Sequence, residues 1–532
     1  MDIEYKWLPH LDGAIPSAGQ GKRISTYTVA LEGWRRGLKL KFYSAFEDGN
    51  KLKVRYSLSN EDRTHHFQLS MGDRVSDEAF KICDDKDLTK QFLKKENVPV
   101  PQGEMFGIDK PKGELIKYGL ALGFPLVVKP TDGNAGKGVF ANITTEEELS
   151  EVVDYVREEL EFEDVIVEKY VEGEEFRIYV LEDRVLGAMN RVPANIVGDG
   201  IHTIRELIHQ KNAQRKLNPH LTSRLIKIDR EIEAILEEKE YELNSIPKKD
   251  EVIYLREKSN LSTGGEAIDV TEELTPELEK IAIDAGKAIP GLSHYGVDMI
   301  VSDDRKKGVI LEVNSRPGLG GHMFPGQGKP RDFAKEIIDY YFPETKGKYR
   351  SNLYFDFDSI LEAVMSRSVE DINVIPPPLE PLYGEKYVIQ VDKEFTYEFR
   401  RRIRRQAIKR EMHGYLEQIE GDIVTVVLLT TEPSDLDKIK QIIKEKMKLN
   451  ILEELEWNKP LLMGFKTTSD TDLSKSEIRD LLVEKQQLER DYERIEKRYA
   501  QIQKSRFWRI TSPLRYVIHN IKLLIRTILS KD

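Results

Sequence analysis

The 532-residue chain contains a single cysteine, Cys83, so it cannot form an intramolecular disulfide or a cysteine-rich zinc module. No run of about 18 apolar residues occurs, which argues against a membrane-spanning helix. The first residues, MDIEYKWLPHLDG, lack the basic and apolar regions of a signal peptide. We therefore expect a cytoplasmic protein that is held together by packed cores.

Positive charge is outnumbered by negative charge over most of the chain, because 82 Lys and Arg compare with 93 Asp and Glu and the net charge is −11. This balance argues against a nucleic-acid partner. Residues 494–532 are the exception: ten basic and two acidic residues give +8, which leaves −19 for residues 1–493. A basic end on an acidic body indicates a separate role for that end.

At about 150 residues per domain, the length predicts three or four domains. Apolar periodicities of strand and helix predict a multidomain chain of the α/β and α+β classes. The expected parts are an N-terminal α/β segment at 1–80, a domain of alternating strands and helices at 81–345, a proline-containing linker at 346–385, a βαββαβ domain at 386–466, a heptad-patterned helix at 476–504 and a basic tail helix at 505–532.

The sequence PLVVKPTDGNAGKGV, residues 125–139, places a glycine-rich loop directly after a buried strand. Glycines let several backbone N–H groups turn toward one ligand, an arrangement that suits phosphate oxygens. Lys129 and Lys137 add positive charge to this loop. Neither a Walker loop nor a Rossmann fingerprint is present. An ordinary turn between strands is the simpler alternative.

Two further strands, within VDMIVSDDRKKGVILEVNSRPG (297–318), each carry one acid, Asp298 and Glu312. Asn314 lies two residues after Glu312 and therefore points to the same strand face. Buried carboxylates require a cation, and two carboxylates with an amide oxygen favour Mg²⁺ that bridges to phosphate. Strand-end acids that face solvent are the alternative, which the apolar context of Glu312 disfavours.

The order of these motifs resembles the ATP-grasp superfamily, in particular cyanophycin synthetase and the glutathione synthetase half of bifunctional glutathione-forming enzymes. The resemblance covers about residues 82–340. The stretches that carry it are DKDLTKQFLKKENVPVPQG (85–103), VVKPTDGNAGKGV (127–139), VEKYVEGEEFRIYVL (167–181), RVPANIVGDGIHTIRELI (191–208), NLSTGGEAIDVT (260–271) and GVDMIVSDDRKKGVILEVNSRPGL (296–319). An ATP-grasp fold is therefore expected for 81–345.

The resemblance implies a role for individual residues. Lys86 and Lys129 look like the two lysines that hold the nucleotide phosphates, and Asp298, Glu312 and Asn314 look like the metal ligands. Arg177, Arg191 and Arg316 sit where the family neutralises a γ-phosphate or a substrate carboxylate. The remaining positions are a lid (Asp132, Gly133, Asn134, Gly136, Lys137, Gly138), an adenine-reading hinge (Glu168, Lys169, Tyr170, Val171), a ribose carboxylate (Glu175) and a substrate loop (Asn260, Ser262, Thr263, Gly264, Gly265).

This family likeness implies an ATP-dependent carboxylate–amine ligase. Such enzymes phosphorylate a carboxylate to an acyl phosphate, which an amine then attacks, and cations supply most of the stabilisation. The implied cofactors are ATP and Mg²⁺, with Mn²⁺ as a substitute. The implied partners are an amine and an amino-acid, peptide or polymer-linked carboxylate. The sequence does not specify the identity of either substrate.

Residues 386–466 resemble acylphosphatase, a ferredoxin-like fold, and Arg400 falls on that family's phosphate-binding arginine. The segment that precedes this arginine, EFTYEF (394–399), lacks the family's glycines, and Gln418 replaces its water-orienting asparagine. We therefore favour a domain that is inactive or weakly active. An acylphosphatase-type hydrolase is the alternative function, and a scaffold in which both folds are degenerate is a third.

Residues 476–504 place Ile478, Leu481, Leu488 and Tyr492 at heptad a and d positions, which predicts a coiled coil and a homodimer. After Pro513, apolar residues occupy one face of a basic helix, which is typical of a contact with an anionic membrane surface or an envelope complex. We expect this tail to place the protein at the inner face of the membrane. A helix that packs on the body is the alternative for each segment.

Overall fold

The computed structural model describes residues 7–47, 51–131, 138–391, 396–420 and 422–468. The chain divides into two compact units, of which the first comprises residues 1–417 and 421–467. In the second unit, only residues 418–420 and 468 are described. The expected coiled coil at 476–504 and tail helix at 505–532 both lie outside the described residues. In the described part of the chain, no helix is long and apolar enough to cross a bilayer.

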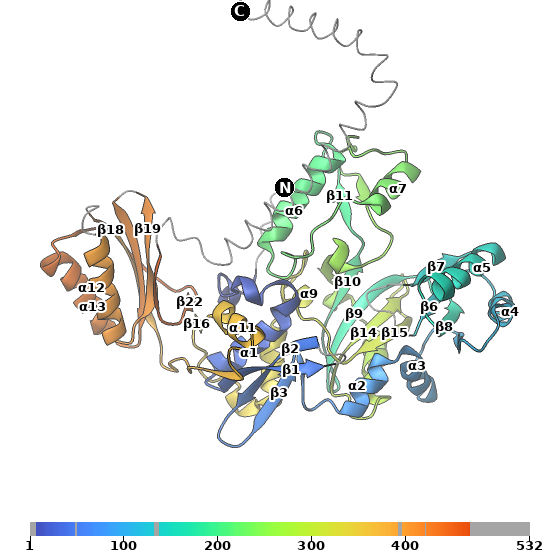
Figure 1. The fold of residues 1–532 in the computed structure, drawn as a ribbon, viewed down its shortest axis with the longest axis horizontal. Coiled ribbons are helices and arrows are strands. Elements are labelled where there is room, and N and C mark those ends of the chain that lie inside the picture. The colour runs from blue at the N-terminus through green and yellow to red at the C-terminus, as the bar shows by residue number, and fades with distance from the viewer. Residues whose placement is uncertain (1–6, 48–50, 132–137, 392–395, 421, 469–532) are drawn as a thin grey trace, which may run out of the picture. The chain divides into compact units, whose positions relative to one another are not determined.

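The N-terminal region forms a five-stranded sheet of order β17-β1-β2-β3-β4 that packs against α1 (Figure 1). The helix α1 is buried along its length, with Tyr27, Leu31 and Trp34 in the core. Helices from much later in the chain, α10 and α11, complete this core. The elements are α1 (Ile24–Arg35), β1 (Lys39–Glu47), β2 (Lys51–Ser59), β3 (Thr64–Gln68), β4 (Met71–Gly72), α10 (Phe333–Tyr341), α11 (Phe357–Met365) and β17 (Asp371–Val374).

The interval 346–385, which we expected to be a linker, contains β16 (Leu353–Tyr354), α11 and β17. The strand β17 pairs with β1 in antiparallel register, with Leu40 opposite Val374. The longest stretch of this interval without helix or strand is 375–382, the part that holds the proline run. The prolines therefore prevent regular structure locally, as expected, whereas the residues before them belong to the N-terminal core.

A four-stranded antiparallel sheet of order β5-β8-β6-β7 follows, with α4 and α5 packed on it (Figure 1). Its small core includes Val128 and Val167. The glycine-rich loop connects β6 to β7, and its residues 132–137 lie outside the described part. The elements are β5 (Gly103–Phe106), α4 (Lys112–Leu122), β6 (Leu126–Pro130), β7 (Phe140–Ile143), α5 (Glu146–Asp154) and β8 (Val165–Lys169).

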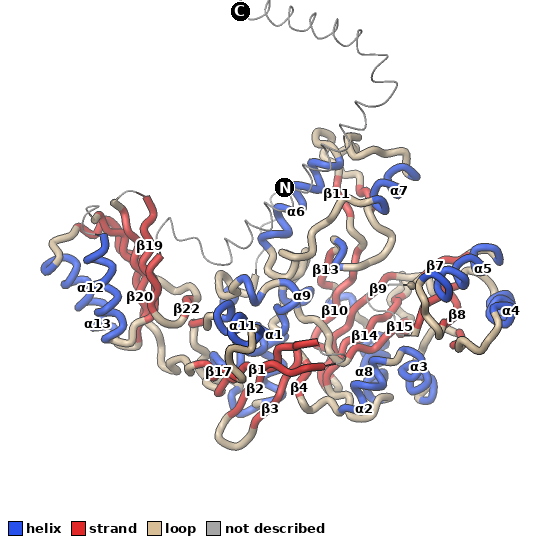
Figure 2. The backbone as a smooth tube through the Cα atoms, in the orientation of Figure 1, coloured by secondary structure: helices blue, strands red, loops and turns tan. Residues whose placement is uncertain are grey.

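The central sheet is antiparallel and has the order β13-β10-β9-β14-β15 (Figure 2). One face is apolar and is covered by α8, α2 and α3, which bury Phe176, Val297 and Val313. The opposite face carries the predicted acids. The elements are α2 (Asp77–Asp84), α3 (Lys86–Lys95), β9 (Glu174–Leu181), β10 (Arg184–Val192), β13 (Glu266–Asp269), α8 (Pro276–Lys287), β14 (His294–Val301), β15 (Gly308–Asn314) and α9 (Gly320–Met323).

A small subdomain at 194–255 is inserted between β10 and β13 and has its own apolar cluster. Thr203 and Glu206 form a capping box at the start of α6, which explains where that helix begins. The helix α7 occupies part of the charged interval 226–242 that we expected to be helical. The elements are β11 (Asn195–Val197), α6 (Ile204–Leu217), α7 (Arg230–Glu238) and β12 (Val252–Tyr254).

The C-terminal domain has the expected order βαββαβ, with α12 and α13 on one face of the sheet β21-β18-β20-β19-β23 (Figure 1). From the other face, Val427 and Leu429 join the N-terminal core. The parallel pair β16 and β22 also links this domain to that core. The elements are β18 (Tyr383–Gln390), α12 (Thr396–Lys409), β19 (His413–Glu420), β20 (Ile423–Thr430), α13 (Pro433–Gln441), β21 (Asn450–Glu456), β22 (Leu461–Leu462) and β23 (Phe465–Thr468).

Candidate active site

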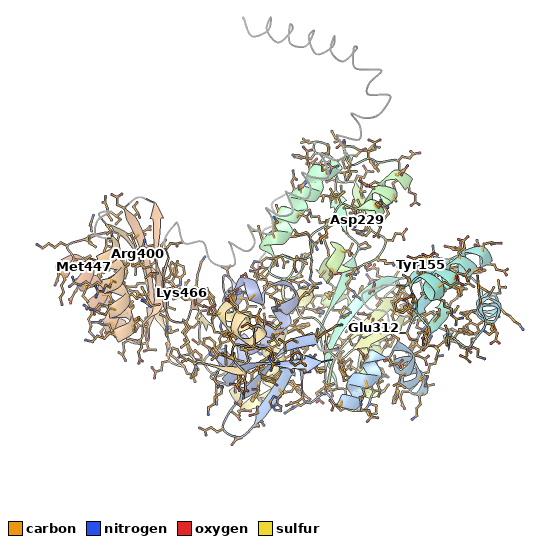
Figure 3. The ribbon with its side chains drawn as sticks, viewed as in Figure 1. Tyr155, Asp229, Glu312, Arg400, Met447 and Lys466 are labelled. Carbon is orange, nitrogen blue, oxygen red and sulfur yellow. The ribbon has the colours of Figure 1, made fainter. Side chains whose placement is uncertain are left out.

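Strand register brings most of the predicted metal and arginine positions onto one face of the central sheet. Asp298 of β14 lies opposite Arg177 of β9 on one side and opposite Glu312 of β15 on the other. Asn314 lies opposite Gly296 and so shares the face of Glu312. These side chains project from the face that the apolar core leaves uncovered. Figure 3 labels Glu312 in this sheet.

Asp298 is the centre of a charged network on this face. Arg177 donates to both of its oxygens, with 2.7 Å from Nη2 to Oδ2. Arg191 lies 2.9 Å from Oδ2 and also pairs with Glu175. Burial alone would raise the pKa of Asp298, but the two guanidinium groups hold it below the ordinary value. Asp298 is therefore a carboxylate in the ligand-free protein.

Glu312 has the opposite electrostatic setting. Among the described residues, no hydrogen bond or ion pair satisfies its carboxyl group. Burial, followed by the negative charge of Asp298, raises the pKa of Glu312 above its ordinary value. Asn314, on the same face, can offer its amide oxygen, whereas its buried Nδ2, which has no partner among the described residues, is a donor and not a metal ligand. The carboxyl oxygens of Glu312 and Asp298 and the amide oxygen of Asn314 are the hard ligands that Mg²⁺ prefers.

The predicted phosphate lysine Lys129 extends from β6 toward Glu168 of β8. Lys129 and Lys90 bind the two oxygens of Glu168, with 3.1 Å from Lys90 Nζ to Oε2. Glu168 is only 2% exposed, and its burial would raise its pKa, yet the two ammonium groups lower it. Lys129 and Lys90 are thus held side by side by one buried carboxylate.

The hinge positions are only partly available to a base. The amide of Lys169 donates to the carbonyl of Gln102, and the amide of Tyr170 donates to that of Pro125. The Lys169 ammonium binds the carbonyls of Gly123 and Phe124. These two amides therefore bind backbone carbonyls in this conformation, and the assignment of 168–171 as an adenine-reading hinge stays a prediction.

Other predicted residues are dispersed around this site. Lys86 at the start of α3 donates to the Thr131 carbonyl over 3.2 Å, at the edge of the glycine-rich loop. Gly138 ends that loop with φ of +74°, which favours glycine, while Asp132, Gly133, Asn134, Gly136 and Lys137 lie outside the described residues. Arg316 lies over the Phe80 ring at 4.5 Å rather than in the network of Asp298.

The expected substrate loop is a short helical turn that starts at Asn260. The Asn260 side chain accepts hydrogen bonds from the Ser262 amide and hydroxyl, and the Thr263 hydroxyl donates to the Asn260 carbonyl. Gly264 adopts φ of +108°, and a Cβ on Gly265 would lie 2.7 Å from the Asn260 carbonyl oxygen. Both glycines are therefore required by the shape of this loop.

Sequence reasoning missed Lys90 and Arg215. Lys90 is one of four lysines in α3, and only the contact with Glu168 distinguishes it. Arg215, on α6, is 1% exposed and donates to the carbonyls of Arg224 and Gly265. An arginine near the end of a helix usually faces solvent, so no sequence signal marked this one.

Arg400, the predicted residue of the C-terminal domain, lies on α12 and not on the central sheet, as Figure 3 shows. The glycine-free segment before it is partly outside the described residues, as 392–395 are. The likeness of this domain to acylphosphatase stays a prediction.

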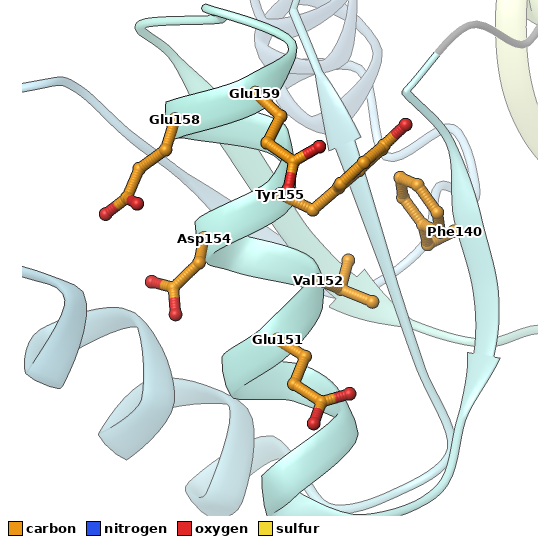
Figure 4. Close-up of a pocket in the computed structure, with 7 residues that line it drawn as sticks. All are labelled: Phe140, Glu151, Val152, Asp154, Tyr155, Glu158 and Glu159. Carbon is orange, nitrogen blue, oxygen red and sulfur yellow. The ribbon is translucent and has the colours of Figure 1, made fainter.

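A hollow of about 500 Å³ opens on the smaller sheet, beside β7 and α5 (Figure 4). Its lining residues are Phe140, Glu151, Val152, Asp154, Tyr155, Glu158 and Glu159. Four of these seven side chains are acidic and would repel phosphate, so this hollow does not suit the nucleotide phosphates.

In the comparison with known families, residues 83–319, which carry the predicted phosphate lysines and the polar face of the central sheet, match the ATP-grasp domain family. Enzymes of that family use ATP and Mg²⁺, which agrees with the donor set around Glu312. The matched segment includes the lysines, the central sheet and the inserted subdomain. The fold predicted for 81–345 is thereby confirmed in its central part.

Curated relatives support the same class. Cyanophycin synthetase of Synechocystis is 38% identical over 274 residues, which are 49% of this chain and 31% of that protein. The glutathione biosynthesis bifunctional protein of Listeria monocytogenes is 37% identical over 333 residues, covering 60% and 41%. A solved bifunctional glutathione synthetase from Pasteurella multocida aligns at 29% identity over 57% and 42% of the two chains, with a TM-score of 0.44. The chain thus spans less than half of these relatives.

Proposed function

We propose that this protein is an ATP-dependent carboxylate–amine ligase that acts on amino-acid or peptide-like substrates. The observation that carries the proposal is the polar face of the central sheet, where Asp298, Glu312 and Asn314 lie beside Arg177 and Arg191 inside an ATP-grasp domain. The names of the curated relatives, cyanophycin synthetase and a glutathione biosynthesis protein, support an amide-forming reaction.

In the proposed reaction, the carboxylate of one substrate takes the γ-phosphoryl group of ATP, which gives an acyl phosphate and ADP. The neutral amine of the second substrate attacks the acyl carbon and forms the C–N bond. The C–O bond to phosphate breaks, phosphate leaves with its electron pair, and the nitrogen loses one proton to give the amide. Asp298, Glu312 and Asn314 would hold Mg²⁺, which would supply positive charge to the phosphate oxygens. Each step requires stabilisation of negative charge, which fixed cations provide without reorganisation.

The residues of the chain contribute in distinct ways. Lys129 and Lys86 bind phosphate oxygens, and Glu168 keeps Lys129 in place through their ion pair. Arg191 stays charged, because Asp298 and Glu175 raise its pKa although burial opposes the charged form. Arg191 is therefore a charged donor beside Asp298, on the face where the phosphoryl group is transferred. Asn260 to Gly265 shape the substrate side.

The test is ADP formation by the full-length chain with ATP, Mg²⁺ and pooled carboxylates and amines. A ligase makes ADP only when both substrates are present, and mass spectrometry then finds an amide. Transfer of ¹⁸O from the labelled carboxylate to phosphate tests the acyl phosphate. Glu312→Gln is the matched inactive control. ADP formation that does not depend on an amine would contradict the proposal.

We further propose that residues 476–504 dimerise the chain and that residues 505–532 bring it to an anionic membrane surface or envelope complex. The heptad pattern and the +8 charge of residues 494–532 support this placement.

A further inference from the structure

Arg224, in the inserted subdomain, carries a charge that nothing in the described structure compensates. It is half-buried, its Nε is enclosed without a hydrogen-bond partner, and no carboxylate of the described residues pairs with it. Burial lowers its pKa. By contrast, Arg256 of the same subdomain is paired with Asp229 at 2.7 Å and with Glu231. A desolvated guanidinium without a partner is costly, so it needs an anion.

The backbone of Arg224 is fixed next to the substrate loop. Its carbonyl accepts hydrogen bonds from Arg215 Nε at 3.0 Å and Nη2 at 2.6 Å, while Nη1 of Arg215 donates to the Gly265 carbonyl at 3.1 Å. One buried guanidinium therefore holds Arg224 and the loop 260–265 together. Ile226 also packs against that loop, since a Cβ on Gly264 would lie 2.6 Å from Ile226 Cγ1.

A second unsatisfied group, His220, lies in the same segment. His220 is 5% exposed, and neither nitrogen of its ring has a hydrogen-bond partner among the described residues. Gly320 makes room for it, because a Cβ at that position would lie 2.0 Å from His220 Nδ1. Burial, followed by the charges of Arg224 and Arg215, lowers the pKa of His220, so the ring is neutral and has one N–H to donate.

Electrostatic neighbours connect this segment to the central sheet. His322 of α9 is among the groups that act on His220, and Arg177 and Arg191 are among those that act on His322. His322 is 2% exposed and also has two nitrogens without partners. Unsatisfied donors therefore continue from Arg224 toward the network around Asp298.

We propose that Arg224, with His220 beside it, binds a carboxylate of the substrate that does not react, next to the loop Asn260–Gly265. A guanidinium binds a carboxylate through two parallel N–H groups, and a neutral imidazole adds one more donor. This assignment rests on the proposed ligase function, because it names the group by which the amino-acid or peptide substrate is recognised. A free phosphate has similar chemistry and is separated from a carboxylate by the test.

The first test compares an accepted amino-acid or peptide substrate with its carboxamide in the ADP assay, using the full-length chain. We expect the wild type to prefer the acid. Arg224→Gln should lower kcat/KM for the acid about tenfold to a hundredfold, mainly through KM, and leave the amide unchanged. Arg224→Lys should retain part of the preference. Arg205→Gln, at an exposed arginine of the same subdomain, should change nothing. An unchanged acid-to-amide ratio in Arg224→Gln overturns the assignment.

The second test needs no turnover and uses thermal unfolding with glycylglycine, glycylglycinamide or inorganic phosphate. We expect glycylglycine to raise the Tm of the wild type but not of Arg224→Gln. Without added ligand, Arg224→Gln should unfold at the same or a higher Tm, because it removes an uncompensated charge. A lower Tm would make Arg224 structural, and stabilisation by phosphate alone would make the site a phosphate site. Either result overturns the assignment, even if no substrate pair supports ADP formation.

Discussion

Asp298 and Glu312 lie opposite each other across two strands, yet their environments move their pKa values in opposite directions. Arg177 and Arg191 occupy both oxygens of Asp298, whereas Glu312 has burial and a neighbouring negative charge. A cation bound on this face would therefore change the electrostatic free energy of Glu312 more than that of Asp298. Glu312 is the residue at which loss of the metal should be most evident.

Glu312→Gln keeps the shape of the side chain and removes its charge. We expect ADP formation to fall by about a thousandfold, since a lost metal ligand removes several kcal/mol of charge stabilisation. The Tm should be unchanged or higher, because the charge in this buried setting is unfavourable without a cation. Turnover and thermal unfolding of the same preparation check both points. Turnover within tenfold of the wild type would contradict the metal assignment.

Lys129→Ala should weaken ATP binding and also destabilise the fold, because Glu168 then keeps only Lys90. The expected loss of unfolding free energy is about 1–3 kcal/mol. Adding Glu168→Gln should recover most of the stability but not the affinity for ATP. Lys129→Arg should rescue affinity poorly, since a planar fork does not replace a compact ammonium. Calorimetric titration with ATP and urea unfolding measure the two effects. If Lys129→Ala combined with Glu168→Gln binds ATP as tightly as the wild type, Lys129 stabilises the fold and does not bind ATP.

Functional residues can be predicted from the sequence where a polar side chain interrupts an apolar strand. Glu312 and Asn314 stand out in VILEVN, and the two-residue spacing places them on one face. Lys90 has no such signal, since it lies among other lysines, and its role depends on a contact with Glu168, 78 positions away. Partners such as Arg177 and Asp298 also require the register of strands that are 121 positions apart.

At the level of elements, strands and helices follow from local periodicity, but their neighbours do not. The order βαββαβ of residues 383–456 is as expected, and so are the strands that carry the acids. The pairing of β17 with β1 was not expected, because Leu40 and Val374 meet only in the folded chain. The N-terminal segment and the expected linker are therefore parts of one core.

The start of helix α10 gives a pH-dependent prediction. Asp332 caps α10 by accepting from the Lys335 amide, and burial, followed by the negative charge of Glu32, raises its pKa to about 6. A raised pKa favours folding below the unfolded value, and this contribution is lost as the pH rises through about 6. Burial lowers the pKa of the neighbouring His10 to about 3, so their 3.2 Å contact is no ion pair at pH 7.

Asp332→Asn keeps a capping side chain without the charge. Relative to the wild type, its unfolding free energy should therefore rise by about 1–3 kcal/mol between pH 4.5 and pH 7.5. Asp356→Asn is the matched control at the cap of α11. Burial opposes the charge of Asp356, but Lys466 and the Ser359 amide lower its pKa below the ordinary value of 3.8. Because both the folded and the unfolded carboxyl are then ionised above pH 4.5, the relative stability of this variant should change little over the same range. Urea unfolding at both pH values measures the difference, and a pH-independent effect of Asp332→Asn would contradict the account.

At the level of the whole molecule, the C-terminal domain is not expected to hydrolyse acyl phosphates. The segment 394–399 has no glycine, and Gln418 is longer than the asparagine of the family it resembles. Because Val427, Leu429 and Leu461 belong to the N-terminal core, an isolated domain would expose them, and the full chain is the proper sample. Benzoyl phosphate hydrolysis should be near background and the same in Arg400→Ala. Fast hydrolysis that Arg400→Ala abolishes would establish a hydrolase instead.

The residues after 468 should decide association and location rather than catalysis. A chain that ends at Thr468 should sediment as a monomer and keep the turnover of the full chain on small substrates, because the lysines and the central sheet lie before residue 319.

The full chain should sediment as a dimer and float with anionic vesicles at low salt. Each basic residue near such a surface contributes about 1 kcal/mol, which salt screens, and two tails in a dimer reinforce each other. Flotation should therefore be lost in about 0.5 M salt and in the shortened chain. A monomeric full chain, or equal flotation of the two chains, would assign the tail to packing on the body.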